Sequence, residues 1–226
     1  MTQIPVRAEQ PPLVLALRLA ALRDPAATAA RIVGSLTKPR AAAPPLRTDL
    51  QVLLAEVLHQ CGERDTAINA AAMAAETAAT ITPLDWPRLF TTLLVGADLA
   101  LCAGHPNAVD ACASACNAVT NLVDPEQERA TIAHALHAVA VHHHLDRAQG
   151  RQQLSFLRKS VPTGSLVEQT VIAGLAAMHT GRAGLGHGLP VPLPSGVLQP
   201  HLDVPTIGWL ADRVRNTPQP GPAATS

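Results

Sequence analysis

The clearest hydrophobic pattern in the chain runs through residues 46–61, where apolar side chains recur at helical spacing. The stripe consists of Leu50, Leu53, Leu54, Val57, Leu58 and Cys61. Positions i, i+3, i+4, i+7, i+8 and i+11 form one face of an amphipathic helix. Gly62 ends this helix, and an alanine-rich run over residues 66–80 follows after a short turn. This succession predicts a helical hairpin.

The same pattern occurs twice more along the chain. Asp85 is placed to cap a helix that has Pro87 in its first turn and ends at Gly104. A second apolar stripe over residues 109–123 predicts the other helix of this hairpin. Asp124-Pro125 then begins a third unit. The remaining predicted helices cover residues 132–143, 150–160 and 166–180.

The hairpins repeat at a regular interval. Aligning Leu53-Leu54 with Leu93-Leu94 and then with Ala135-Leu136 gives spacings of 40 and 42 residues. Helix-turn-helix periods of this size are typical of helical repeat arrays. The sequence therefore predicts an all-α fold and favours an α-solenoid, with another all-α bundle as the alternative.

The turns between the predicted helices resemble those of tetratricopeptide repeats. Residues 62–67, Gly-Glu-Arg-Asp-Thr-Ala, and residues 104–108, Gly-His-Pro-Asn-Ala, have the glycine, turn and alanine order of that family. The resemblance covers residues 46–181 in a degenerate form, because the period exceeds the usual ~34 residues and the chain has no tyrosine. It implies a right-handed α-solenoid in which the first helix of each hairpin lines a concave groove.

Proline and glycine divide the chain into three parts. Residues 1–37 are predicted to form an N-terminal helix pair, and prolines in residues 37–47 separate it from the repeat domain, residues 46–181. Residues 182–226 form a Pro/Gly-rich tail with one short helix at about 206–215. Because the tail contains many apolar residues, we expect much of it to lie against the repeats.

Composition and charge exclude several classes of partner. Lys plus Arg and Asp plus Glu number 17 each, and aromatic residues make up 2% of the chain, so neither a basic footprint nor stacking platforms for nucleic acid are present. The apolar residues 13–22 are interrupted by Arg18 and are too short for a membrane span, and no other segment is long enough. We expect no direct nucleic-acid partner and no membrane partner. The 15 arginines, 2 lysines and abundant alanine resemble proteins from high-GC bacterial genomes.

The four cysteines suit a reduced, cytoplasmic protein, because a chain of this length and apolar content does not need disulfides. Cys112 and Cys116 lie four residues apart and could ligate a metal, but they belong to an apolar stripe, so we expect core packing. The sequence has no Walker A motif, nucleophile elbow, H-E-x-x-H pair or C-x-x-C pair. We therefore assign no catalytic residue, cofactor or metal.

Histidines mark the most unusual predicted surface. His134, His137 and His144 lie opposite the apolar stripe of their own helix, on the side that also carries Val141. In tetratricopeptide-like geometry this side faces the groove. The neighbouring first helices would add Glu56, His59, Asp98, Leu99 and Cys102. Such a face is either a solvated surface, a pH-sensitive surface, or a site for a metal or an acidic ligand.

These features favour a non-enzymatic interaction or regulatory scaffold that binds a peptide, a protein or a second copy of itself as a homodimer. Two other functions stay open. One is a ligand-sensing module of a bacterial transcription-regulatory system. The other is a small helical enzyme of a biosynthetic pathway that uses the histidine-rich face. Separately, Glu56 and Asp98 occupy similar places in consecutive units, where they would act as a general acid and base or, as the spacing of separate helices favours, in ligand binding or solvation.

The same periodicity identifies the side chains expected to form the core. These are Leu53, Leu54, Leu58, Leu93, Leu94, Leu101, Cys112, Leu136 and Val139.

Overall fold

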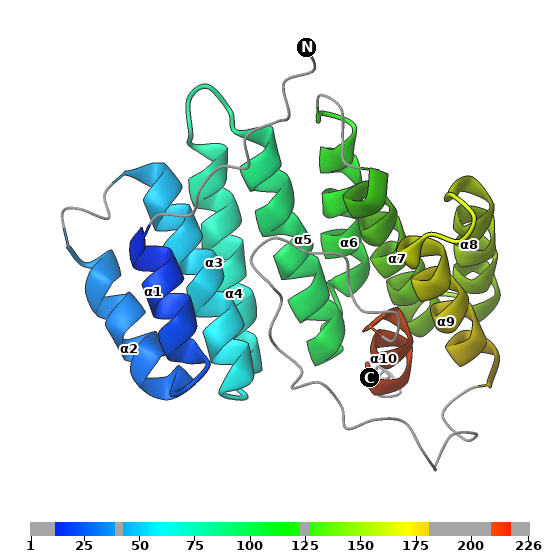
Figure 1. Cartoon of the computed structure of the whole chain (residues 1–226), viewed down its shortest axis with the longest axis horizontal. Coiled ribbons are helices and arrows are strands. Elements are labelled where there is room, and N and C mark those ends of the chain that lie inside the picture. Colours follow the sequence, from blue (N-terminus) through cyan, green and yellow to red (C-terminus); the bar gives the residue numbers. More distant parts are fainter. Residues whose placement is uncertain (1–11, 39–42, 123–126, 181–208, 218–226) are drawn as a thin grey trace, which may run out of the picture.

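The computed structural model describes residues 12–38, 43–122, 127–180 and 209–217 and is all-α, with no strand in these ranges (Figure 1). The helices of these ranges are α1 (Pro12–Ala21), α2 (Pro25–Leu36), α3 (Pro44–Gln60), α4 (Arg64–Ala79), α5 (Trp86–Ala103), α6 (Ala108–Val119), α7 (Gln127–His144), α8 (Arg147–Ser160), α9 (Leu166–Thr180) and α10 (Trp209–Asn216). The prediction of an all-α chain is confirmed.

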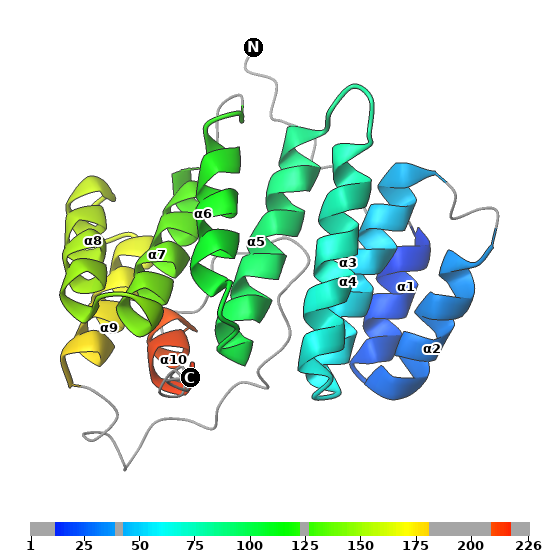
Figure 2. The same cartoon turned by 180° about the vertical axis from the view of Figure 1, so that it is seen from behind.

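The helices are arranged in two layers. Each of α1, α3, α5 and α7 contacts the next odd-numbered helix, and each even-numbered helix from α2 to α8 packs against the odd-numbered helices beside it in sequence. Figure 1 shows the odd-numbered layer with α10 lying on it, and Figure 2 shows α4, α6 and α8 from behind. Helix α10 contacts α5, α7 and α9. The far end of the described chain therefore lies on the odd-numbered layer.

Local signals fix where the helices begin and end. The side chains of Asp24, Asp85 and Asp146 accept hydrogen bonds from backbone N–H groups in the first turns of α2, α5 and α8. Gly104 ends α5 in the left-handed conformation, with φ of 66°, which glycine adopts without steric cost. These short-range effects explain why the observed boundaries of the hairpin helices lie close to those that the sequence predicts.

The tail is described only in part. Helix α10 occupies Trp209–Asn216, where the sequence predicts a helix at about 206–215. The expected packing of the rest of the tail, residues 182–208, lies outside the described residues.

The core consists of three clusters arranged along the chain. One joins α1, α2 and α3, a second joins α3, α4 and α5, and the largest joins α5 to α10. Of the predicted core residues, Leu54, Leu58 and Leu93 are only partly buried against these clusters. The other six are buried: Leu53, Leu94, Leu101, Cys112, Leu136 and Val139.

Helix α5 corrects one expectation from the sequence. Its 18 residues have a mean hydropathy of 1.2, which makes it long and apolar enough to cross a membrane. The prediction that no segment reaches this length is therefore wrong. Half of the helix is buried inside the protein, between the second and third core clusters. This burial explains its apolar composition as that of a core helix.

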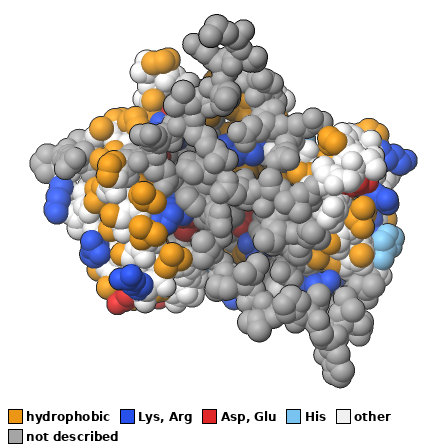
Figure 3. Space-filling model, viewed as in Figure 1, with side chains coloured by type: hydrophobic (Ala, Val, Ile, Leu, Met, Phe, Trp, Pro, Cys, Tyr) orange, Lys and Arg blue, Asp and Glu red, His pale blue; other side chains and the backbone are white. Residues whose placement is uncertain are grey.

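An apolar stripe is exposed on α1. Leu15 and Leu19 are 49% and 57% exposed, and their spacing of four residues places them on one helix face. Leu22, which directly follows the end of α1, is 63% exposed. Val33 of α2 is also exposed. Figure 3 shows hydrophobic side chains gathered on the left of this view, over α1 and α2.

Helices α7 and α8 approach each other most closely at Gly150. A Cβ atom added at Gly150 would lie 2.6 Å from three atoms of α7, namely the carbonyl oxygen of Ala138 and the backbone nitrogen and Cβ of His142. Backbone atoms cannot rotate away as the end of a long side chain can. The glycine is therefore required by the packing of this hairpin.

Replacing Gly150 with alanine is expected to lower the free energy of unfolding by about 1–3 kcal/mol, because the helices must separate. Gly34→Ala is the matched control, since a Cβ at Gly34 of α2 meets nothing within 4 Å. This control should raise stability by about 0.5–1 kcal/mol through helix propensity. Urea denaturation of both variants measures the difference. Equal stability of the two variants would show that the close approach has no energetic effect.

Candidate functional site

A buried ion pair joins α5 to α10. Asp98 lies on α5 between apolar neighbours, and its side chain is 2% exposed. The guanidinium of Arg213 on α10 donates from Nε to Oδ1 at 2.7 Å and from Nη2 to Oδ2 at 3.0 Å. Such a two-point contact is the strongest geometry for an arginine and a carboxylate. Arg213 therefore neutralises an acid that the fold has removed from water.

Two predicted residues surround this ion pair. The Sγ atom of Cys102 lies 4.0 Å from Oδ1 of Asp98, one turn along α5. Burial, followed by the charge of Asp98, raises the pKa of Cys102 to about 12. Burial lowers the pKa of His59 on α3, while the charge of Asp98 acts in the opposite direction. At neutral pH the thiol is protonated and is not a nucleophile.

The apolar side of α10 completes the contact. Leu210, Ala211 and Val214 are buried in the largest core cluster. A Cβ added at Gly174 of α9 would lie 2.6 Å from Cδ2 of Leu210 and 2.9 Å from its Cγ. A side chain at position 174 would occupy the space that Leu210 fills. Gly174 therefore forms a notch for Leu210, and we call the surface of α5, α7 and α9 that α10 contacts the α10 seat.

Glu56 forms a separate buried ion pair on α3. Its Oε2 atom accepts a hydrogen bond from Nη1 of Arg18 on α1 at 2.8 Å, and its side chain is 3% exposed. Burial raises the pKa of Glu56 to about 7, and this effect exceeds the lowering by Arg18. Glu56 and Asp98 are thus each held by a different arginine. They are not arranged as a shared acid-base pair.

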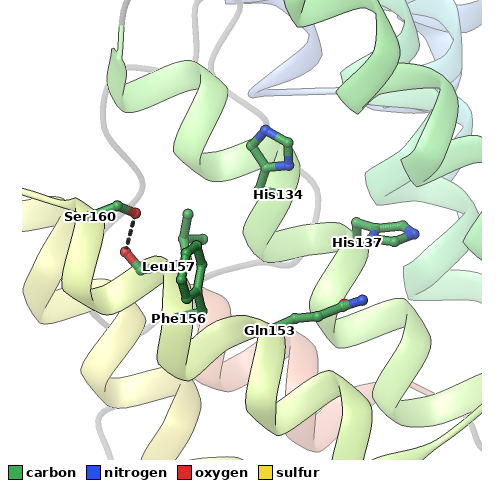
Figure 4. Close-up of a pocket in the computed structure, with 6 residues that line it drawn as sticks. All are labelled: His134, His137, Gln153, Phe156, Leu157 and Ser160. Carbon is green, nitrogen blue, oxygen red and sulfur yellow. Dashed lines mark hydrogen bonds between the residues drawn. The ribbon is translucent and has the colours of Figure 1, made fainter.

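His134 and His137 line a pocket between α7 and α8. Its volume is about 410 Å³, and it is also lined by Gln153, Phe156, Leu157 and Ser160 (Figure 4). Phe156 is 74% exposed. Burial, followed by the charge of His134, lowers the pKa of His137. In Figure 4 the two imidazoles project from α7, the other four side chains come from α8, and α10 lies behind these helices.

The structure thus divides the predicted site residues. His59, Asp98 and Cys102 come together beside Arg213, Glu56 pairs with Arg18, and His134 and His137 share the α7–α8 pocket. His144 lies near His105, whose charge, after burial, lowers the pKa of His144. Leu99 and Val141, which were expected on the polar side, are buried. Helix α7 has little polar surface because it contacts α5, α6, α8, α9 and α10.

Cys112 and Cys116 behave as the core residues that the sequence predicts. Cys112 is fully buried, and Cys116 packs against the same cluster. Burial raises the pKa of both thiols, that of Cys116 to about 11. Among the described residues, no three His, Cys, Asp or Glu side chains are placed to hold a metal ion.

No family model, no curated protein and no solved structure matches this chain.

Sequence reasoning missed Arg213 and Gly174, which form the α10 seat together with Asp98. One signal for them was present, because an aspartate inside the apolar run from Leu93 to Leu101 requires a cation when it is buried. Arg213 was the third residue of the predicted tail helix after Leu210. Nothing in the sequence linked the two residues, which are 115 positions apart.

Proposed function

We propose that this protein is a non-enzymatic, cytoplasmic interaction scaffold that binds an amphipathic helix of a peptide or protein partner on the α10 seat. Three observations support a degenerate tetratricopeptide-like solenoid as its architecture: consecutive hairpins, contacts between successive odd-numbered helices, and three core clusters in chain order. In such an array the odd-numbered layer is the concave, partner-binding side.

The observation that carries the proposal is the docking of α10. This helix has only eight residues, and isolated helices shorter than ~12 residues are marginal in water. Its helical state therefore depends on burial of Leu210, Ala211 and Val214 and on the ion pair of Arg213. The α10 seat therefore holds a short amphipathic segment in its helical form. In helix-in-groove recognition, the apolar face of an amphipathic helix binds to a protein surface in the same way. Helix α10 then occupies the place of a partner.

The test uses the full chain with a protease recognition site introduced between residues 185 and 200. Cutting the folded protein there breaks the covalent connection between α10 and the other helices. This connection otherwise keeps α10 at a high effective concentration near its seat. We expect a fluorescent peptide of residues 206–217 to exchange with the cut segment and to bind saturably. Fluorescence anisotropy measures this binding, and unlabelled peptide should compete.

Two controls locate the binding. The double variant His134→Ala with His137→Ala changes the α7–α8 pocket and should leave peptide binding unchanged. Gly174→Ala fills the notch for Leu210 and should weaken binding while the helices keep their circular dichroism. Absence of saturable binding to the cut protein would refute the proposal. Loss of binding only in the double histidine variant would move the site to the α7–α8 pocket.

One observation favours a second function, the sensing of a small ligand. The α7–α8 pocket has a volume of about 410 Å³, within the ~300–1,000 Å³ of small-molecule sites. Its exposed Phe156 offers an aromatic face beside two imidazoles. This arrangement suits a planar, acidic ligand.

The exposed leucines of α1 separately offer a second copy of the chain an apolar surface, which supports a homodimer as one form of partner.

A further inference from the structure

We propose that the α10 seat selects helices that carry an arginine, and that Asp98 is the residue that recognises this arginine. The inference rests on the proposed function and defines the chemistry of the partner. The partner helix would present a leucine to the notch at Gly174 and, three residues later, a guanidinium to Asp98, with a further apolar residue beside it. This is the pattern of Leu210, Arg213 and Val214.

Burial of Asp98 makes the cation necessary. The carboxylate of Asp98 is buried where α10 contacts α5, and 2% of its side chain is exposed. A helix with an uncharged residue opposite Asp98 would displace water from the carboxylate without supplying a cation in its place. Burying an unpaired charge in this way is strongly unfavourable. Among the described residues, the ion pair of Asp98 is with Arg213, and burial lowers the pKa of nearby His59, which disfavours its charged form. The incoming helix therefore has to supply the positive charge.

The geometry favours arginine over lysine. Both oxygens of Asp98 are engaged, one by Nε and one by Nη2 of Arg213. The planar guanidinium presents these two donors in parallel, whereas a lysine ammonium is a single point of charge. Lysine would satisfy the charge of Asp98 but would leave one oxygen with a poorer contact. We therefore expect the order arginine, lysine, then uncharged residues.

The register of the helix follows from two fixed points. Leu210 is anchored where Gly174 lacks a side chain, and Arg213 reaches Asp98 on α5. Residues three apart lie on the same face of a helix, so both contacts form together. Sliding the helix by one residue would rotate both side chains away from their partners. The spacing between leucine and arginine is thus a specificity element of the seat.

The experiment compares peptides of residues 206–217 on the cut, full-length protein described above. We expect Arg213→Gln in the peptide to weaken binding at least about ten-fold, with Arg213→Lys between the two. The peptide Asn216→Ala changes an exposed position of α10 outside the ion pair and should bind within about three-fold of the unaltered peptide. Competition against the labelled peptide measures each affinity.

The variant Asp98→Asn tests which residue reads the arginine. On this protein the preference for arginine over glutamine should fall below about two-fold, while Leu210→Ala in the peptide should still weaken binding.

If the unaltered chain binds the arginine and glutamine peptides equally, the inference is wrong and the proposed function stands. If Asp98→Asn keeps the full preference, a different residue reads the arginine and the inference is also wrong. If no peptide binds, the proposed function itself fails. Should Asp98→Asn not fold, the peptide series on the unaltered chain still decides.

Discussion

Replacement of Leu94 by alanine is expected to lower the free energy of unfolding by about 2–5 kcal/mol. Leu94 lies on α5 and is 1% exposed within the largest core cluster, together with Phe90 and Leu101. Removing its side chain loses buried apolar contacts and leaves a cavity that the surrounding helices fill only in part. Urea denaturation followed by circular dichroism measures the change.

Leu19→Ala is the matched control for this prediction. The same atoms are removed from α1, where Leu19 is 57% exposed, so stability should change by no more than about 0.5 kcal/mol. A loss below about 0.5 kcal/mol for Leu94→Ala would mean that the rotation of α5 about its axis is assigned incorrectly.

The second large effect is a dependence of stability on pH that originates at Glu56. Burial raises the pKa of this carboxyl from 4.5 to about 7 in the folded protein. Between these values the folded chain binds a proton that the unfolded chain does not, so stability falls as pH rises from about 4.5 to about 7. By linkage the contribution is ~3 kcal/mol across this range, because each pKa unit corresponds to about 1.4 kcal/mol.

Glu56→Gln should remove this contribution, because an amide does not titrate. The quantity to measure is the difference in unfolding free energy between Glu56→Gln and the unaltered chain at pH 5 and pH 8. A difference is needed because His59 and His137 have lowered pKa values and make stability rise with pH. The unfolding free energy of the variant, relative to that of the unaltered chain, should be higher at pH 8 than at pH 5. Glu76→Gln, at an exposed position on α4, should show no such gain. An unchanged difference at the two pH values would contradict the assignment.

The hairpin helices could be predicted from the sequence because their signals are local. The stripe through Leu53 and Val57, the cap at Asp85 and the stop at Gly104 act within a few residues, and the structure has helices where they predict them. Core positions followed from the same periodicity. Leu54, Leu58 and Leu93 are only partly buried because the packing of the neighbouring helices, and not the periodicity of one helix, decides how much of each side chain is covered.

The candidate site could be predicted only in part. Helical periodicity identified His134 as a surface residue, and the structure leaves it exposed. It could not show that α8 would cover one side of His134 and His137, because that depends on how α7 and α8 pack. The partner of Asp98 was hidden for a different reason. A contact across 115 residues leaves no periodic signal in a single sequence.

That long separation also has a consequence for the order of events during synthesis. Domains fold from the N-terminus as the chain is made, at ~5–20 residues per second. The 115 residues between Asp98 and Arg213 therefore take ~6–23 s to make. Helices α7 and α9, which complete the α10 seat, are made within this interval, and α10 is the last of the described helices to be made. After α9 is complete and before α10 is made, Asp98 has no ion pair with Arg213, and a helix that binds the seat as proposed would not first have to displace α10.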